Sequence, residues 1–226
     1  MAVKVRDTGP HSQSADYEVL HSLEGASLFI DVRRSSQIVT FVERHRGIDQ
    51  AASLFMRFLT GTMQAINGPT MTACRPNGDA VLATFAGKTR VCDAVNAAAR
   101  AINFVHHEFN TDNQRLLSCD GGCRLSRCPG TLRFDVGAGI DAGFIAVSQM
   151  SSPSWHHEEL VSSCINISSK LSGRVCSPLS VAITLDAYHQ AAPGQLGAYQ
   201  WHQRFLKIAG RYRRVLLTDP RRTAGI

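Results

Sequence analysis

The sequence lacks an uninterrupted apolar run long enough to cross a membrane, and its opening residues, MAVKVRDTGPHSQ, lack the apolar segment of a signal peptide. We therefore expect a cytoplasmic protein that does not associate with a membrane. No internal repeat is evident. The cysteines number seven, which is odd, and without a secretion signal they predict reduced thiols rather than a disulfide framework.

Length and composition favour one domain. The chain has 226 residues, of which 44% are apolar, and this is enough for one α/β domain with a sizeable core but crowded for two. Its net charge of +6 and isoelectric point near 9.1 suit an acidic ligand such as a nucleoside triphosphate. The same charge also suits nucleic acid, so charge alone does not choose between these ligands.

The segment SLFIDVRRSS contains an apolar run followed by an acidic residue. Residues 28–30 predict a β-strand that brings Asp31 to the strand end. Ser35 or Ser36 then caps a helix that begins around Gln37. This order places a carboxylate beside the free N–H groups of a helix N-terminus.

A second acidic strand end lies in NGDAVLATF. Its Asn77-Gly78 pair predicts a tight turn that presents Asp79, and residues 81–85 predict the strand that follows. Two carboxylates beside helix N–H groups suit two divalent metal ions and a polyphosphate. Either aspartate alone is as well explained as a helix cap or a turn residue.

These motifs resemble the catalytic domains of class III adenylate and guanylate cyclases. Four features occur in the order found in that family: Asp31 after its strand, Gly78-Asp79 before the next strand, GIDAG at 139–143 and INISSKL at 165–171. Each motif alone is weak, but together they span roughly residues 20 to 190. The resemblance implies a ferredoxin-like palm, with residues 19–190 as the nucleotide cyclase catalytic domain.

Hydrophobic spacing independently predicts an α+β fold. The expected elements are a strand at 27–30, helices at 38–42 and 51–66 with a break near Gly47, a hairpin of 71–74 with 81–85, a helix at 92–109, strands at 132–136 and 140–147, a helix at 160–171 and a strand at 181–185. This order predicts a central, largely antiparallel sheet with helices on one face.

The two ends of the chain carry fewer signals. Residues 1–18 are polar and predict a loose leader. Residues 191–226 form a basic extension, for which a hairpin that completes the same domain is favoured over a tail that contacts RNA.

A cysteine-rich stretch raises the question of zinc. Three thiols at Cys119, Cys123 and Cys128 suit zinc if one more ligand joins them. The candidates for that ligand are His106, His107 and Cys92. The spacing is not CxxC, so a glycine-containing loop with partly buried thiols is the favoured interpretation.

The cyclase resemblance implies a site for metal and phosphate. Asp31 and Asp79 would hold two Mg²⁺ or Mn²⁺ ions, with the carbonyl oxygen of Val32 as a further ligand. The amides that follow, in Arg33, Arg34 and Ser35, would cradle the β- and γ-phosphates. The implied reaction is attack of the ribose 3′-hydroxyl on the α-phosphorus, which expels pyrophosphate and needs no protein nucleophile.

Two further residues match the family's catalytic helix. Asn166 and Lys170 lie four apart, so they share one face of a helix. They match the asparagine that positions the ribose and the arginine that stabilises the pentacovalent transition state. A lysine neutralises developing charge but cannot offer the bidentate fork of arginine.

The base pocket differs from that of adenylate cyclases. Where those enzymes place a lysine and an aspartate or threonine, this sequence has Arg75 and Glu159. Arginine donates to carbonyl oxygens and glutamate accepts from a ring N–H, which disfavours adenine and cytosine. Uracil and guanine both fit, and hydrogen-bond logic does not separate them.

Two features resemble the pyrimidine cyclases of bacterial Pycsar anti-phage systems: a catalytic domain without an appended sensor, and DVRRSS where other cyclases have a glycine-phenylalanine pair. This resemblance implies a uridylate cyclase that makes cyclic UMP, which a separate effector reads in anti-phage defence. It also implies a homodimer in which each site takes Asp31 and Asp79 from one protomer. The other protomer would supply Arg75, Glu159, Asn166 and Lys170.

Other functions remain open. One is a guanylate or other nucleotide cyclase, and another is a catalytically silent module whose basic surface binds nucleic acid or protein. Both metal carboxylates are present, which favours the enzyme over a module that binds nucleic acid. The basic residues that could grip the triphosphate are Lys207, Arg211, Arg213 and Arg214.

Overall fold

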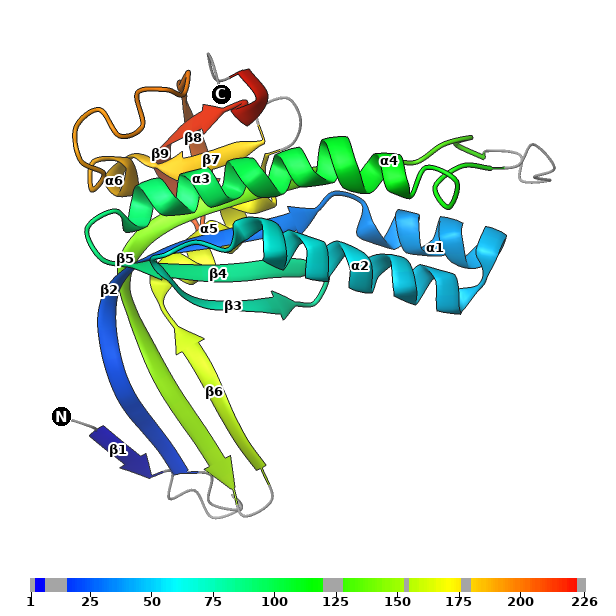
Figure 1. Cartoon of the computed structure of the whole chain (residues 1–226). Coiled ribbons are helices and arrows are strands. Elements are labelled where there is room, and N and C mark those ends of the chain that lie inside the picture. The colour runs from blue at the N-terminus through cyan, green and yellow to red at the C-terminus, as the bar shows by residue number, and fades with distance from the viewer. Residues whose placement is uncertain (1–2, 7–15, 120–127, 153–154, 176–179, 223–226) are drawn as a thin grey trace.

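The computed structural model of the chain describes residues 3–6, 16–119, 128–152, 155–175 and 180–222 (Figure 1). The described strands are β1 (Val3–Arg6), β2 (Asp16–Val32), β3 (Met71–Asn77), β4 (Ala80–Ala86), β5 (Val136–Ser152), β6 (Trp155–Val161), β7 (Val181–Thr184), β8 (His202–Ile208) and β9 (Arg211–Thr218). The helices are α1 (Ser35–Arg46), α2 (Ile48–Ile66), α3 (Arg90–Asn103), the π-helix η1 (Phe104–Phe109), α4 (Asn110–Asp112), α5 (Ser163–Ser172), α6 (Leu185–Tyr188) and the 3₁₀ helix η2 (Pro220–Arg222).

The described strands form one sheet in the order β3-β4-β2-β5-β7-β9-β8, with β1 added to β2 and β6 added to β5. Every pairing is antiparallel except that of β5 with β7. The prediction of an α+β fold around a largely antiparallel sheet is confirmed.

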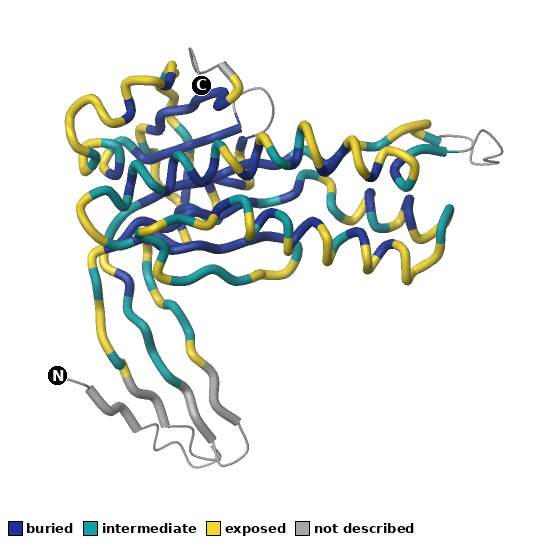
Figure 2. The backbone as a smooth tube through the Cα atoms, viewed as in Figure 1, coloured by how far each residue is buried: buried dark blue, intermediate teal, exposed yellow. Residues whose placement is uncertain are grey.

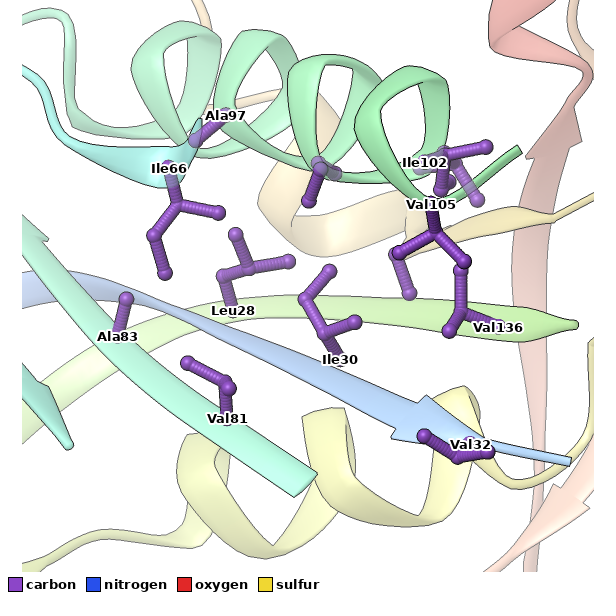
Figure 3. Close-up of a cluster of buried hydrophobic side chains, with 14 of the residues drawn as sticks. Leu28, Ile30, Val32, Ile66, Val81, Ala83, Ala97, Ile102, Val105 and Val136 are labelled. Carbon is purple, nitrogen blue, oxygen red and sulfur yellow. The ribbon is translucent and has the colours of Figure 1, made fainter. Parts of the chain in front are cut away.

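Helices cover both faces of the sheet, so the prediction of helices on one face is wrong. Along β2, Leu28 and Ile30 pack with α2 and α3 (Figure 3). Phe29, which lies between them in the sequence, packs with α5. Successive side chains of a strand point to opposite faces. An unbroken apolar run therefore indicates a strand that is buried on both sides, and Figure 2 shows the sheet buried where helices cover it.

The central strands are longer than the sequence predicts. β2 begins at Asp16 rather than at Ser27, and its first residues pair with β1. The residues predicted to form a loose leader therefore include strand β1 and the beginning of β2. Together with β5 and β6, the outer part of β2 extends away from the helices as an arm (Figure 1).

The glycines of GIDAG lie inside one strand, β5, and do not separate two strands as predicted. A Cβ at Gly137 would lie 2.3 Å from the carbonyl oxygen of Ser172, and a Cβ at Gly139 would lie 2.0 Å from that of Ser168. Both oxygens belong to α5. These two glycines thus allow a helix backbone to approach the sheet closely, which is a role for glycine other than turning the chain.

The helix boundaries are partly confirmed. The break at Gly47 is present, and this residue has a φ of 93° that favours glycine. α1 begins at Ser35 rather than near Gln37, and its N-cap is Arg34, with no side-chain cap hydrogen bond. The predicted helix at 51–66 is α2, and the helix predicted at 92–109 is α3 continued by η1.

The helix predicted at 160–171 begins later, as α5 at Ser163. Ser162 is its N-cap, and the Ser162 hydroxyl accepts a hydrogen bond from the Cys164 amide at 3.1 Å. The residues before this cap form strand β6, so Glu159 lies on a strand and not in a first helical turn.

The C-terminal hairpin is confirmed. β8 and β9 pair with each other, and β9 joins the sheet beside β7, with Val181 opposite Thr218. Leu171 of α5 packs with Val215 and Leu217 of β9. The boundary that separates this extension at residue 191 stays a prediction.

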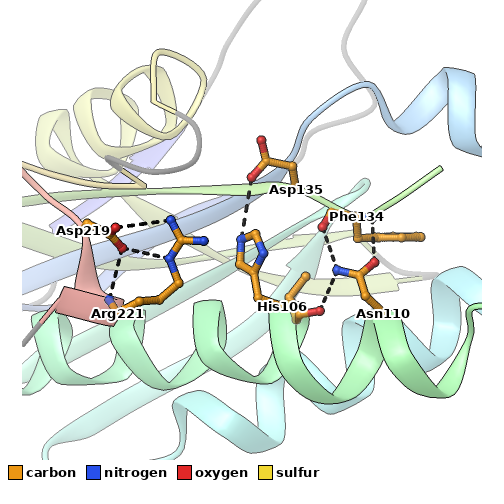
Figure 4. Close-up of polar contacts among 7 residues, drawn as sticks. His106, Asn110, Phe134, Asp135, Asp219 and Arg221 are labelled. Atoms are coloured by element: carbon orange, nitrogen blue, oxygen red, sulfur yellow. Dashed lines mark hydrogen bonds and ion pairs between the residues drawn. The ribbon is translucent and has the colours of Figure 1, made fainter. Parts of the chain in front are cut away.

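Asn110 holds the segment that leads into β5 (Figure 4). Its side-chain amide donates to the carbonyl oxygens of Val105 at 2.7 Å and Phe134 at 2.9 Å, and its side-chain oxygen accepts from the Phe134 amide at 2.8 Å. The next carbonyl, that of Asp135, accepts a hydrogen bond from the Arg33 amide at 2.7 Å. This chain of contacts fixes the end of β2, where the acidic residues lie.

None of the helices in the described part of the chain combines the length and apolar character needed to cross a bilayer.

Candidate functional site

The two acidic strand ends lie side by side. Asp31 in β2 is opposite Ala80 in β4, and Asp79 immediately precedes Ala80 in the two-residue turn between β3 and β4. Gly78, the first residue of this turn, has a φ of 64°, a conformation that glycine adopts without strain. The charge of Asp79 contributes to raising the pKa of Asp31, so the two carboxylates interact electrostatically.

Asp31 has a perturbed carboxyl group. Partial burial raises the pKa of Asp31, the Arg33 guanidinium opposes this shift, and the negative charge of Asp79 adds to it. The side chain of Asp31 is 27% exposed. A cation at this position would relieve the repulsion between two neighbouring acids.

Arg33 supplies one positive charge there. Its guanidinium donates to the Asp31 carboxylate, to the Ser172 carbonyl oxygen at 2.7 Å and to the Gly173 carbonyl oxygen at 2.8 Å. These two carbonyl groups lie at the C-terminal end of α5, where the helix dipole favours a cation. Arg33 therefore ties the end of β2 to the end of α5.

The acidic pair fits divalent metal ions. Its donors are carboxylate oxygens, which suit hard cations such as Mg²⁺ and Mn²⁺. The guanidinium of Arg33 already occupies the Asp31 carboxylate as a cation, which shows that this carboxylate accepts positive charge in the folded chain. Asp31 and Asp79, with the Val32 carbonyl beside them, are the residues that could hold the metal.

The structure supports only part of the predicted phosphate cradle. The Arg33 amide donates to the Asp135 carbonyl, so it is already committed to the protein. Arg34 is the N-cap of α1 and Ser35 is its first residue. The Gln37 amide already donates to the Arg34 carbonyl oxygen at 2.9 Å, so the amides of Arg34, Ser35 and Ser36 are the candidates for binding an anion.

Arg75 and Glu159 lie 84 residues apart in the sequence and form an ion pair. Arg75 comes from β3 and Glu159 from β6, and the Arg75 guanidinium also donates to the Glu158 carbonyl oxygen at 3.1 Å. The two side chains are 29% and 38% exposed. The predicted donor and acceptor for a base edge are thus neighbours on the surface.

Asn166 and Lys170 lie one turn apart on the exposed side of α5. Lys170 borders a cavity of about 380 Å³ that Arg174, Lys207 and Gly210 also line. Among the C-terminal basic candidates, the structure therefore brings Lys207 to Lys170. Arg213 instead lies near Asp141, whose pKa it helps to lower against the raising effect of burial.

The acidic pair and Arg75 lie on the face of the sheet that α5 covers. Asp31 points to the same side of β2 as Ser27, whose hydroxyl lies 2.8 Å from that of Ser168 in α5. Arg75 is opposite Leu82, and Leu82 packs against Cys164 and Ile165 of α5. Residues from four parts of the sequence, listed here, therefore share one side of the molecule: Asp31, Arg75 with Asp79, Glu159, and Asn166 with Lys170.

Two polar features on this side were not predicted from the sequence. The first is the contact of Arg33 with α5, because the sequence suggested only its backbone amide. The second is Asp141, a buried carboxyl group that accepts a hydrogen bond from the Thr184 hydroxyl. Burial raises the pKa of Asp141. Its place in GIDAG was the available signal, but the motif does not reveal what the side chain contacts.

Comparison with known proteins identifies the fold. No family model and no curated protein sequence matches the chain. Among solved structures, the adenylyl cyclase CyaB from P. aeruginosa superposes with a TM-score of 0.67 and 15% identity, over 91% of this chain and 98% of that one. The guanylate cyclase domain of RhGC from Catenaria anguillulae, in complex with GTP, gives 0.61 and 13%, over 88% and 97%.

A bacterial light-regulated adenylyl cyclase gives a TM-score of 0.65 and 14% identity over 88% of this chain. The matched region spans about half of that longer protein, 52%. At such low identity the likeness concerns the fold. The chain has the fold of class III nucleotide cyclase catalytic domains.

Proposed function

We propose that this chain is a nucleotide cyclase that converts UTP to 3′,5′-cyclic UMP and pyrophosphate. The observation that carries the proposal is the meeting of Asp31 and Asp79 at neighbouring strand ends within a cyclase fold. The ion pair between Arg75 and Glu159 supports the choice of base.

The reaction joins the ribose 3′-oxygen to the α-phosphorus and breaks the bond from that phosphorus to the pyrophosphate oxygen. Two Mg²⁺ or Mn²⁺ ions, when bound, lower the pKa of the 3′-hydroxyl and balance the charge of the phosphates. Asp31, Asp79 and the Val32 carbonyl would hold them. Arg33 would then release the Asp31 carboxylate, while the carbonyl oxygens of Ser172 and Gly173 retain its guanidinium.

The exposed residues of α5 act on the sugar and the phosphorus. Asn166 hydrogen-bonds the ribose and orients its 3′-oxygen, and Lys170 offsets the charge that develops on the pentacovalent phosphorus. Lysine is a compact point charge, so it supplies charge without the two-point geometry of arginine. Lys207, which lines the same cavity, is our candidate for the triphosphate.

Arg75 and Glu159 would read the base. The guanidinium donates to a carbonyl oxygen and the carboxylate accepts from a neighbouring ring N–H. Uracil offers O4 beside N3–H, and guanine offers O6 beside N1–H. We favour uracil because DVRRSS resembles the corresponding segment of the pyrimidine cyclases, and formation of cyclic GMP would instead support the guanine alternative.

The same resemblance supports three further parts of the proposal: a homodimer with two shared sites, a separate effector that reads the product, and a role in anti-phage defence. Each site would combine the acidic pair of one protomer with Arg75, Glu159, Asn166 and Lys170 of the other. The two groups would then face each other across a twofold axis.

The acidic pair is tested by two variants, Asp31→Asn and Asp79→Asn. Each removes a metal-binding charge, and loss of several kcal/mol of transition-state stabilisation corresponds to a fall in kcat of about 10³-fold. The control is Asp49→Asn, which changes an exposed aspartate in the first turn of α2. Turnover is measured with UTP and Mn²⁺, and circular dichroism verifies folding.

We expect Asp49→Asn to match the wild type and both site variants to fold normally, since Asp31 and Asp79 lie outside the hydrophobic core. Wild-type turnover by either site variant would contradict the metal assignment.

A further inference from the structure

A group of metal-ligating side chains lies apart from the catalytic residues. Within the described residues, one ligand atom each from His45, Cys119 and Cys128 lies within 4.8 Å of the other two. His45 is in the last turn of α1, and the two cysteines flank residues 120–127. All three side chains are half-buried. The histidine lies more than 70 residues before the cysteines in the sequence, so the fold brings these ligands together.

Backbone hydrogen bonds hold the two cysteines together. The Cys119 amide donates to the Gly130 carbonyl oxygen at 2.7 Å, and the Leu132 amide donates to that of Leu117 at 2.8 Å. Between them, Ser118 and Thr131 form an isolated β-bridge. This short antiparallel ladder brings together the two parts of the chain that contain Cys119 and Cys128.

α1 is attached to the same segment. The guanidinium of Arg46, the residue after His45, donates to the carbonyl oxygens of Arg115 at 3.2 Å and Ser118 at 3.3 Å. These hydrogen bonds hold the last turn of α1 beside the ladder. The histidine is therefore brought to the cysteines by contacts that do not involve the thiols.

A backbone contact determines the tautomer of the His45 imidazole. Its Nδ1 lies 2.7 Å from the Phe41 carbonyl oxygen, and only a protonated nitrogen can donate to a carbonyl. The neutral ring then carries its lone pair on Nε2, the form that coordinates a metal. The Phe41 ring, 4.3 Å away between centroids, further restricts the imidazole.

We propose that His45, Cys119 and Cys128 bind one Zn²⁺ ion. Two thiolates and an imidazole are donors that suit zinc, whereas the carboxylates of the acidic pair suit Mg²⁺ or Mn²⁺. Three protein ligands leave the fourth tetrahedral position to water or another donor. The ion would link the last turn of α1 to the segment that leads into β5. The first turn of α1 belongs to the proposed phosphate site.

This assignment corrects the ligand set considered from sequence. Among the described residues, the histidine that joins the thiols is His45. Cys92 instead lies 3.8 Å from the Gln195 carbonyl oxygen, and His106 lies beside Asp135. His107 is absent from the group, and Cys123 lies outside the described residues. The adjacency of 106 and 107 in the sequence suggested a ligand pair that the fold does not use.

The test measures metal in the full chain, purified under reducing conditions without chelator. Elemental analysis should give one zinc per wild-type chain and less than a tenth of that in His45→Ala and Cys128→Ser. Cys92→Ser is the matched control, since it removes another half-buried thiol, and it should keep its zinc. Asp31→Asn should keep zinc too, which separates this site from the catalytic metals.

Reconstitution with Co²⁺ provides a second measurement. The wild type should develop a thiolate-to-cobalt charge-transfer absorption, and Cys128→Ser should lose most of it. The wild-type spectrum alone shows whether thiolates bind the metal, so this part of the test remains decisive even if Cys128→Ser fails to fold.

Three results would overturn the proposal. The first is a wild-type chain that takes up neither zinc nor cobalt when reduced. The second is equal loss of zinc in Cys92→Ser. The third is a Cys119–Cys128 disulfide in the unreduced protein, shown by peptide mapping, because a disulfide removes both thiolates.

Discussion

The packing of α5 against β5 leads to a quantitative prediction for Gly139→Ala. A methyl group at Gly139 would lie 2.0 Å from the Ser168 carbonyl oxygen, 2.5 Å from the Ser172 amide nitrogen and 2.8 Å from the Leu171 Cβ. Two of these atoms are helix backbone, which cannot rotate away. The substitution therefore requires α5 to move from the sheet.

Forcing extra atoms into a packed core typically costs 1–3 kcal/mol, and this contact with backbone places Gly139→Ala at the upper end, about 3 kcal/mol. For a chain of this size, the same loss lowers the melting temperature by roughly 6–12 °C. Because α5 carries Asn166 and Lys170, its displacement should also lower kcat with UTP.

Gly143→Ala is the matched control. Gly143 lies in the same strand, and a methyl group there would meet only the Cys164 Cβ, at 3.7 Å. Neither glycine has a positive φ, so the two substitutions differ mainly in the space available. Replacing a strand glycine where space exists should be neutral or stabilising, within about 1 kcal/mol.

Thermal and urea unfolding, followed by circular dichroism, measure both changes in the free energy of unfolding. A Gly139→Ala protein that unfolds within about 1 kcal/mol of the wild type would refute the close approach of α5.

The remaining predictions concern substrate choice and assembly. Arg75→Lys should lower UTP turnover and loosen selectivity, because a compact ammonium replaces a planar set of donors, and unchanged product ratios from the four nucleoside triphosphates would exclude Arg75 as a base reader. Mixing inactive Asp31→Asn with inactive Asn166→Ala should restore about a quarter of wild-type sites, since about half of randomly paired dimers are mixed and each of these has one intact site. Continued inactivity, with subunit exchange shown by mass-tagged chains, would place both residues in a site within one chain.

The sequence predicted well where the signal is local. Periodicity located α2 and α3, the apolar character of residues 215–217 indicated the C-terminal hairpin, and Gly47 marked the break between α1 and α2. It failed where the deciding contact is distant. The glycines of β5 suggested a turn because the close approach of α5 is a tertiary feature. The predicted helix began at residue 160, whereas residues 155–161 pair with β5, the preceding strand, and α5 begins at Ser163.

In the candidate site, too, local features were predicted from the sequence and distant contacts were not. Asp31 and Asp79 were located because each follows a local rule for strand ends and turns, and their order matched a family pattern. Their proximity required the pairing of β2 with β4. The contact of Arg33 with the end of α5 spans about 140 residues, and His45 meets the cysteines only after α1 and the ladder pack together. Spacing along the sequence contains no signal for either contact.

The central claim is that the chain cyclises UTP, and the most direct test uses the purified full-length protein. It is incubated separately with UTP, GTP, ATP and CTP in the presence of Mn²⁺, and products are resolved by chromatography and identified by mass. We predict 3′,5′-cyclic UMP with one equivalent of pyrophosphate, less cyclic GMP, little product from ATP or CTP, and none in Asp31→Asn. Absence of every cyclic nucleotide from a folded, dimeric, Mn²⁺-loaded protein would contradict the account.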